Sequence, residues 1–355
     1  MHGVRLWRGQ PTELCAVAGI TTISRRSFLI MSAAALAACR EKDEVLKITG
    51  MTMGTQYNVI AIAPNRQVQK PAVVAAIETA LAEVNAQMSN WDPASEISRI
   101  NAAGSETIQL SPALAHVLEG ADSVHRASDG RFDVTVGPLI DLWGFGAGTT
   151  QPHVPADAEI TAAMARTGQS RVLDIQGATL RKSGPEAGIY LSAIGKGHGV
   201  DRVAEAVRGF GITDFMVEIG GDLYTSGRNA DGTAWQIGIE NPVAGNRSVY
   251  RVAEVSDLGM ATSGDYRNYF ESDGTRYSHI IDPATGRPIL HDTVSATVLT
   301  DSAMLADAWA TAMLVLGRAR GLEIAETEGL AVAFIDRTGD TFTTTESSRF
   351  AALQA

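Results

Sequence analysis

The sequence predicts an α+β protein with one large domain, a mixed and mainly antiparallel sheet, and helices packed on that sheet. Two observations support this fold class. Expected strands and helices are mixed along the chain without the strict alternation of a doubly wound parallel sheet. Short apolar runs broken by Gly and Pro dominate from residue 170 onward, while apolar stripes at helical spacing mark a few longer helices. Hydrophobic residues make up 45% of the 355 residues, which excludes disorder as a description of the whole chain.

The N-terminus has the order of parts found in an exported lipoprotein. The pair Arg25 and Arg26 precedes an apolar stretch over 28–38, and small residues lead into Cys39. This order predicts a twin-arginine lipoprotein signal peptide over 1–38, lipidation at Cys39 and a lipidated tether over 39–46. The expected location is the periplasmic face of the inner membrane, with the lipid as the membrane anchor. A short N-terminal helix of the fold is the alternative.

Cysteine usage and charge exclude several kinds of chemistry. The two cysteines are Cys15, inside the expected leader, and Cys39, so the folded part would carry no thiol. Disulfides, Cys-ligated zinc, Fe–S clusters and a Cys nucleophile are thereby excluded. The net charge of −11 argues against nucleic acid as a partner, because that interaction needs a broad basic surface.

In the first half of the chain, a strand is expected over 47–63. A helix opening at Pro71 carries an apolar stripe from Val73 to Met88. Ser111 and Pro112 form an N-cap and first helical position, and that helix runs to about Ser128. A loop over 146–156 leads into a short helix over 155–167.

In the second half, helices are expected over 195–207, 302–316 and 319–328. Short apolar runs predict strands near 171–175, 188–192, 213–218, 234–240, 251–262, 276–281, 293–299 and 330–336.

Asp307 and Thr311 are the densest chemical signal. They lie four residues apart and so share one face of a helix that is otherwise apolar. A hard cation such as Mg²⁺ would explain a carboxylate and a hydroxyl in such a place, because it prefers oxygen ligands. The alternative is an Asp that caps a loop and a Thr that bonds back to its own helix.

Two glycine-rich segments precede or join regular elements. The segment 195–199 opens a helix, where backbone N–H groups and the helix N-terminus favour an anion such as phosphate. The alternative is a tight turn with no ligand. Gly220 and Gly221 follow an expected strand and would serve either as a tight turn or as a backbone platform for a ligand.

Three further candidates are ambiguous by themselves. His279 is the last polar side chain before an Asp-Pro-x-Thr-Gly turn, where a structural histidine is the common alternative to a catalytic one. The segment 131–139 reads either as a binding loop or as a strand edge. Trp91 reads either as a ligand contact or as a core aromatic.

Taken in order, these segments resemble the FAD:protein FMN transferases, the ApbE family once called thiamine biosynthesis lipoproteins. The resemblance covers roughly 47–345 and fits an ApbE-like, T-fold-related architecture, with 346–355 left as a C-terminal tail. The matching blocks are 53–55, 88–93, 95–101, 132–139, 142–146, 191–197, 220–222, 279–286 and 307–311.

The resemblance implies transfer of the FMN part of FAD to a Thr or Ser hydroxyl of an acceptor protein, with release of AMP and with Mg²⁺ as cofactor. It implies acceptors among subunits of quinone or ferredoxin oxidoreductase complexes. Carried over by position, the metal ligands are the main-chain carbonyl of Ala193 and the side chains of Asp307 and Thr311. His279 would assist the acceptor hydroxyl or orient the phosphates, with Asp307 as the second catalytic residue. The implied FAD contacts are Met53, Trp91, Arg131, Phe132, Asp133, Tyr190, Lys196, Gly220, Gly221 and Ile281.

The sequence departs from the family pattern at three positions. Tyr190 stands where many relatives carry Asp, Trp91 where Tyr is common, and Ala310 where some members place a further Asp beside the metal. Two other functions remain open at this point: an FAD pyrophosphatase that releases FMN and AMP, and a lipoprotein that binds FAD without catalysis.

Overall fold

The computed structural model describes residues 43–355 except 65–67, 147–150, 244 and 246–247. The expected signal peptide, the twin-arginine pair and Cys39 lie outside the described residues. Within residues 43–355, apart from those gaps, no helix is long and apolar enough to span a bilayer.

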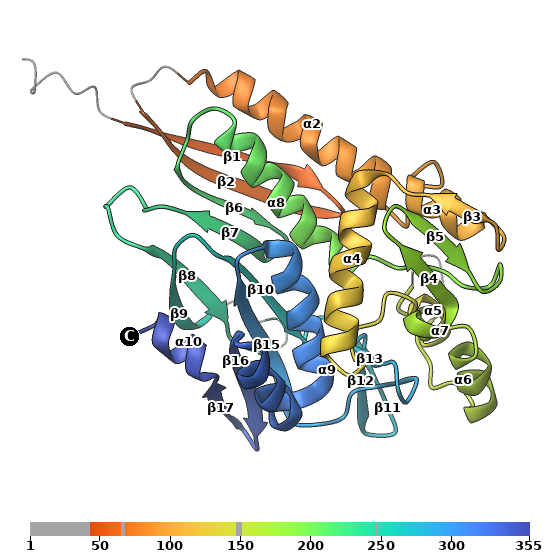
Figure 1. Ribbon diagram of the computed structural model, residues 1–355. Helices are drawn as coiled ribbons and strands as arrows, with labels where there is room; N and C mark the ends of the chain where they lie inside the picture. Colours follow the sequence, from red (N-terminus) through yellow and green to blue (C-terminus); the bar gives the residue numbers. More distant parts are fainter. Residues whose placement is uncertain (1–42, 65–67, 147–150, 244, 246–247) are drawn as a thin grey trace, which may run out of the picture. The chain divides into compact units, whose positions relative to one another are not determined.

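An eight-stranded sheet in the order β1-β2-β6-β7-β10-β15-β16-β17 organises the fold (Figure 1). Every neighbouring pair in it is antiparallel, which confirms the α+β class with a mainly antiparallel sheet. The strands are β1 (Glu44–Thr52), β2 (Thr55–Ala63), β6 (Asp214–Ile219), β7 (Asp222–Ser226), β10 (Gly259–Gly264), β15 (Thr293–Thr300), β16 (Ala331–Thr338) and β17 (Thr341–Glu346).

Four longer helices cover one face of this sheet: α2 (Lys70–Met88), α4 (Pro112–Ala127), α8 (Gly195–Arg208) and α9 (Ala303–Glu328) (Figure 1). Apolar side chains of α2 and α8 pack with β1, β2 and β6, those of α9 pack on β15 and β16, and α4 packs on α9. The strands alternate their side chains between the two faces. Val298 therefore joins the α9 cluster, while its neighbour Leu299 packs on the opposite face with β8 (Trp235–Glu240) and β9 (Val249–Val255).

The remaining elements are short and lie mostly around the helical side. They are α3 (Glu96–Ala102), β3 (Thr107–Gln109), α5 (Gly137–Leu142), α6 (Asp157–Met164), α7 (Gln169–Val172), β4 (Leu173–Gln176), β5 (Thr179–Lys182), β11 (Tyr269–Ser272), β12 (Thr275–Ser278), β13 (Ile281–Asp282), β14 (Arg287–Pro288) and α10 (Ser348–Leu353).

Several expected strands are divided by turns. The expected strand 47–63 is a hairpin, because Met53 and Gly54 both adopt positive φ and reverse the chain. The expected strand 251–262 ends at Val255 and resumes at Gly259, and 276–281 divides into β12 and β13. The expected break between two C-terminal helices falls at Gly317, whose φ of 70° interrupts α9.

The expected strand over 188–192 was wrong. Its backbone pairs with asparagine side chains instead of a neighbouring strand. The Ile189 carbonyl accepts hydrogen bonds from the side-chain amides of Asn90 at 2.7 Å and Asn101 at 2.8 Å. The Leu191 N–H donates to Asn90 Oδ1 at 3.0 Å. The Tyr190 N–H donates to the Val134 carbonyl at 2.7 Å, and the segment lies outside any sheet.

Both expected terminal segments belong in part to the folded unit of residues 43–355. β1 begins at Glu44, inside the segment assigned to the tether. At the other end, residues 346–355 complete β17 and form α10, and Phe350 of that helix is fully buried against the β8–β9 hairpin cluster.

Candidate active site

A cavity of about 530 Å³ lies beside the N-terminal end of α8, and its size suits a small-molecule ligand. It gathers side chains or backbone from segments that are far apart in the sequence. Of the residues expected at the site, the following line it: Trp91, Arg131, Phe132, Asp133, Tyr190, Ala193, Lys196, Gly220, Gly221, His279, Ile281, Asp307 and Thr311.

Met53 is not among the residues that line the cavity. Its side chain instead packs on α8, where its terminal methyl carbon would lie 2.6 Å from a Cβ built on Gly199. Met53 also contacts both helical core clusters. The structure therefore places Met53 in the packing between the β1–β2 turn and α8.

The glycines of α8 allow the two central helices to touch backbone to backbone. A Cβ on Gly197 would lie 2.2 Å from the Ala303 carbonyl oxygen, at the start of α9. The carboxylate of Asp201, on α8, accepts the N–H groups of Ala303 at 2.9 Å and Met304 at 3.0 Å and so caps α9. This contact brings the Gly197 N–H within 3.1 Å of Asp307 Oδ2.

Three charged side chains meet where α8, α9 and β7 approach one another. Lys196 Nζ forms an ion pair with Asp222 and lies 3.6 Å from Asp307 Oδ1. The two aspartates are 3% and 4% exposed, respectively. Burial and the neighbouring Asp307 charge raise the pKa of Asp222 despite Lys196. Burial by itself would lower the pKa of Lys196, but the two carboxylates outweigh it and raise that pKa.

The oxygen atoms at this point fit a small hard cation. Asp307 and Thr311 sit one helical turn apart on the cavity wall, and Ala193 lines the same wall. Thr311 Oγ1 lies 3.1 Å from Ser263 Oγ on β10, so a second hydroxyl is adjacent. One ammonium opposes two buried carboxylates, which leaves a local excess of negative charge. In the described part of the chain, no group of three or more His, Cys, Asp or Glu side chains could hold a metal, so Asp307 would depend on hydroxyl and carbonyl partners.

His279 is held in one tautomer by the chain itself. Its Nδ1 lies 3.1 Å from the Asn268 carbonyl oxygen, and its own N–H donates to the same oxygen at 3.0 Å. A carbonyl can only accept, so Nδ1 carries the proton of the neutral ring and Nε2 keeps the lone pair. Burial lowers the pKa of His279, and the Lys196 charge lowers it further, although the Asn268 carbonyl opposes both. His279 therefore lines the cavity as a neutral imidazole at pH 7.

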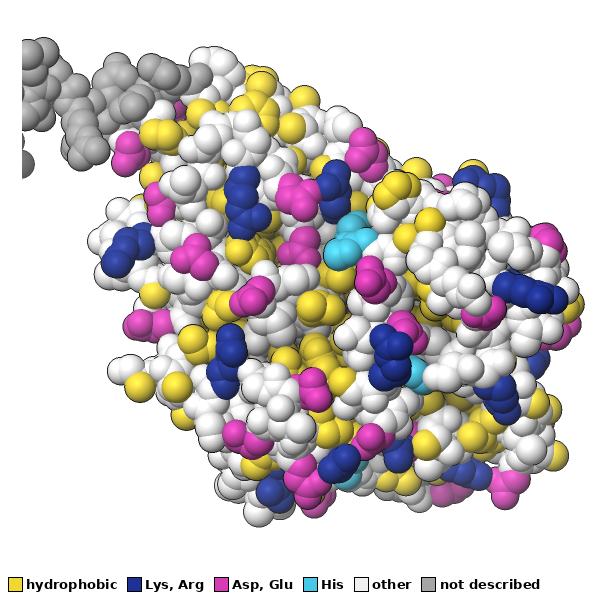
Figure 2. Space-filling model, viewed as in Figure 1, with side chains coloured by type: hydrophobic (Ala, Val, Ile, Leu, Met, Phe, Trp, Pro, Cys, Tyr) yellow, Lys and Arg dark blue, Asp and Glu magenta, His cyan; other side chains and the backbone are white. Residues whose placement is uncertain are grey.

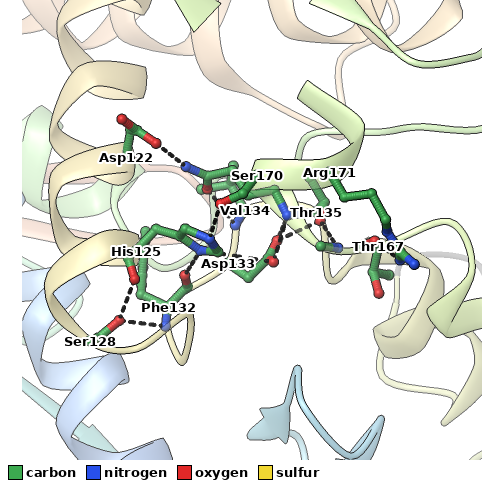
Figure 3. Close-up of polar contacts among 12 residues, drawn as sticks. Asp122, His125, Ser128, Phe132, Asp133, Val134, Thr135, Thr167, Ser170 and Arg171 are labelled. Carbon is green, nitrogen blue, oxygen red and sulfur yellow. Dashed lines mark hydrogen bonds and ion pairs between the residues drawn. The ribbon is translucent and has the colours of Figure 1, made fainter. Parts of the chain in front are cut away.

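Asp133 faces the cavity wall, but its carboxylate is used inside the loop (Figure 3). Oδ1 accepts both the backbone N–H of Thr135, at 2.7 Å, and the Thr135 hydroxyl. Oδ2 accepts the N–H of Gln169 at 2.8 Å, at the start of α7. The geometry assigns Asp133 to shaping the binding loop.

His125 on α4 fixes the same loop from its other side (Figure 3). Its Nδ1 donates to the Phe132 carbonyl at 2.6 Å, and its Nε2 accepts the Ser170 hydroxyl at 2.7 Å. Arg131, next in the loop, pairs with Asp282 at 2.5 Å and so ties the loop to the turn that follows His279.

Trp91 and Tyr190 form an aromatic wall at the cavity. Their ring centroids are 5.8 Å apart at an interplanar angle of 60°. Trp91 is 59% exposed, which excludes the core-aromatic alternative and leaves its ring open to a ligand. Burial raises the pKa of the Tyr190 hydroxyl, and the nearby Asp141 carboxylate raises it further.

Sequence reasoning missed several residues of the cavity. Asp222 lies in the motif block 220–222, but only the structure shows that it belongs to the site, through its buried ion pair with Lys196. Ser263, Asn268 and the Glu240–Arg267 ion pair also line the cavity or its wall, but no local pattern marks them. On the face drawn in Figure 2, basic side chains are interspersed with acidic ones, without a continuous basic patch of the kind that nucleic acid would need.

Comparison with known proteins agrees with this geometry. Residues 53–334 match the sequence profile of the ApbE family. The chain is 45% identical over 316 residues to the FAD:protein FMN transferase of Vibrio cholerae, covering 89% of this chain and 94% of that protein. The structure of flavin transferase ApbE from Vibrio cholerae superposes with a TM-score of 0.81 at 44% identity, covering 87% of this chain and 99% of that one. The apo form of Pseudomonas stutzeri flavinyl transferase ApbE also gives 0.81, at 36% identity, covering 88% and 98%. The resemblance seen in the motif blocks is thereby confirmed, and the chain belongs to the ApbE family.

Proposed function

We propose that this protein catalyses the Mg²⁺-dependent transfer of the FMN moiety of FAD to a Thr or Ser hydroxyl of an acceptor protein, with release of AMP. One observation carries the proposal. A cavity of small-molecule size brings together the buried Asp307–Thr311 pair, the Lys196 ammonium and a neutral His279. The membership of the chain in the ApbE family supports the same reaction.

The reaction forms a bond between the acceptor oxygen and the phosphorus of the FMN part, and it breaks the pyrophosphate bond to AMP. The His279 Nε2 lone pair accepts the proton of the acceptor hydroxyl. The Lys196 ammonium, which lines the cavity at the start of α8, would neutralise part of the negative charge of the pyrophosphate. Asp307, Thr311 and the Ala193 carbonyl would hold Mg²⁺, which when bound neutralises charge on the pyrophosphate oxygens. Trp91 offers its exposed ring to the flavin.

The proposed acceptor is the one that the family resemblance implies, and the proposed location follows from the N-terminal motifs. Subunits of quinone or ferredoxin oxidoreductase complexes are the proposed acceptors. The twin-arginine pair and Cys39 support a lipid-anchored protein on the periplasmic face of the inner membrane. A Cys39→Ser variant should lose membrane association, while residues 40–355 keep transfer activity.

The test is incubation with FAD, Mg²⁺ and an acceptor subunit, followed by mass spectrometry of the acceptor and measurement of AMP. We expect the acceptor to gain the mass of FMN with an equal amount of AMP. AMP without a mass gain would identify an FAD pyrophosphatase, and FAD binding without AMP would identify a non-catalytic carrier. Either result would overturn the proposal.

The Asp307→Asn variant tests the metal assignment. It keeps the shape of the side chain and removes its charge, so AMP release should fall by at least ~10²-fold, as when a main electrostatic stabiliser is lost. Asp231→Asn, in an exposed turn away from the cavity, is the matched control and should leave the rate unchanged. Coincident Mg²⁺ titrations of AMP release in the wild type and Asp307→Asn would show that Asp307 is structural.

A further inference from the structure

One lysine at the cavity forms ion pairs with two buried carboxylates, and the two ion pairs differ in distance. Lys196 Nζ is in direct contact with Asp222 Oδ2 but is 3.6 Å from Asp307 Oδ1. Both aspartates are almost fully buried, so neither is stabilised by bulk water. The ammonium therefore lies nearer to Asp222 on β7 than to Asp307 on α9, the helix that also carries Thr311.

The position of Asp222 is set by the sheet and not by the helices. Asp222 is the first residue of β7 and pairs in register with Ile219 of β6. Gly220 and Gly221 make the connecting turn with φ of 58° and 104°, values that favour glycine. The Gly221 N–H donates to Glu218 Oε1 at 2.6 Å, which fixes the turn. Asp222 is thus a rigid anchor for the flexible lysine side chain.

The two buried carboxylates and the single ammonium do not balance in charge. A single ammonium can neutralise only one of two buried carboxylates, and the other then needs a different cation. Because the ammonium lies in contact with Asp222 and 3.6 Å from Asp307, it neutralises the Asp307 carboxylate only in part. The Gly197 N–H at 3.1 Å supplies a neutral hydrogen bond to Asp307, but no charge.

We propose that Asp222 is a positioning residue for metal binding: it keeps the Lys196 ammonium nearer to itself than to Asp307 and so leaves the Asp307 carboxylate available to Mg²⁺. Asp222 acts through Lys196 and is not itself a ligand. The inference rests on the proposed function, which assigns Mg²⁺ to Asp307.

The experiment is a calorimetric titration of the full chain with MgCl₂ in the absence of FAD, repeated as a thermal-shift titration. Asp222→Asn frees Lys196 to close on Asp307, so the Mg²⁺ affinity should fall by about tenfold or more. In the double variant Asp222→Asn/Lys196→Met, the competing ammonium is also gone, and the affinity should recover to within about threefold of the wild type. Lys196→Met by itself leaves two carboxylates without an ammonium and should bind Mg²⁺ at least as tightly as the wild type.

The Mg²⁺ affinities of these variants either support or overturn the positioning role of Asp222. Unchanged affinity in Asp222→Asn would overturn the inference. A double variant as weak as Asp222→Asn would also overturn it, because Asp222 would then act as a ligand or as a purely structural residue. If Asp222→Asn does not fold, Lys196→Met still decides, since weaker binding in that variant contradicts the proposed competition. Asp307→Asn separates the two claims: if it leaves Mg²⁺ binding intact, the metal assignment of the proposed function fails and not only the role of Asp222.

Discussion

Replacing Gly197 by Ala tests the close contact of α8 and α9 on which the site depends. The added Cβ would lie 2.2 Å from the Ala303 carbonyl oxygen, 2.6 Å from the Ala303 carbonyl carbon and 2.7 Å from Met304 Cα. All three are backbone atoms, so no side-chain rotation relieves the overlap. Ordinary contact would require the helices to separate by about 1 Å in a close-packed interior.

The magnitude follows from three contributions. Overpacking of this kind costs about 1–3 kcal/mol in the free energy of unfolding. Separation of the helices also lengthens the hydrogen bond from the Gly197 N–H to Asp307, and a bond to a charged group contributes about 1.5–3 kcal/mol. Alanine is favoured over glycine inside a helix by about 1 kcal/mol, which offsets part of the loss. The expected net loss is about 1.5–5 kcal/mol.

Urea unfolding followed by circular dichroism measures this loss, and Gly195→Ala is the matched control in the same motif. A Cβ on Gly195 would meet its nearest neighbour, Leu191 Cβ, at 3.8 Å, which is ordinary contact. Gly195 is the first residue of α8, where the helix-interior advantage of alanine does not apply in full, so Gly195→Ala should change the free energy of unfolding by less than about 0.5 kcal/mol. Equal stabilities of the two variants would refute the reasoning, because the α8–α9 approach would not be as close as the structure has it.

Three further predictions concern single side chains. Trp91→Ala should weaken FAD binding about threefold to tenfold through lost stacking, and Trp91→Phe should retain most of the affinity, as measured by fluorescence titration. Equal affinities of the wild type and both variants would show that Trp91 does not contact the flavin. His279→Gln should lower transfer by about 10²-fold or more with little change in FAD affinity. Because the pKa of His279 is lowered, the wild-type rate should fall with decreasing pH only below the ordinary histidine pKa of about 6.5. A fall in rate that begins above pH 6.5 would contradict this. Burial lowers the pKa of His198 to about 4, with added repulsion from His116 and Arg202, so only the unfolded chain binds this proton between about pH 6.5 and 4. The free energy of unfolding should fall by up to about 3 kcal/mol as the pH decreases through that window, and His198→Gln should lose this share of the pH dependence in urea unfolding.

Elements with strong local signals were predictable from the sequence. Ser111 and Pro112 marked the start of α4, where the Ser111 side chain accepts the Leu114 N–H at 3.2 Å. The apolar stripe from Val73 to Met88 marked α2, and a glycine divides α9 where two helices were expected. Capping and helical periodicity involve residues within a few positions of each other, so the local sequence suffices to specify them.

The motif blocks likewise predicted most of the residues that line the cavity, because Lys196, His279 and Asp307 follow one another in the order of the motifs of the family that the sequence resembles. Only the tertiary structure decided which groups pair: Asp222 with Lys196, Ser263 with Thr311, and the asparagines that occupy the backbone of 188–192. It also decided that Met53 packs on Gly199 and not in the cavity. These contacts join residues that are tens to more than a hundred positions apart, and they depend on how sheet and helices pack. A local pattern reports the burial and chemistry of a residue but not the partner that satisfies its charge or hydrogen bonds.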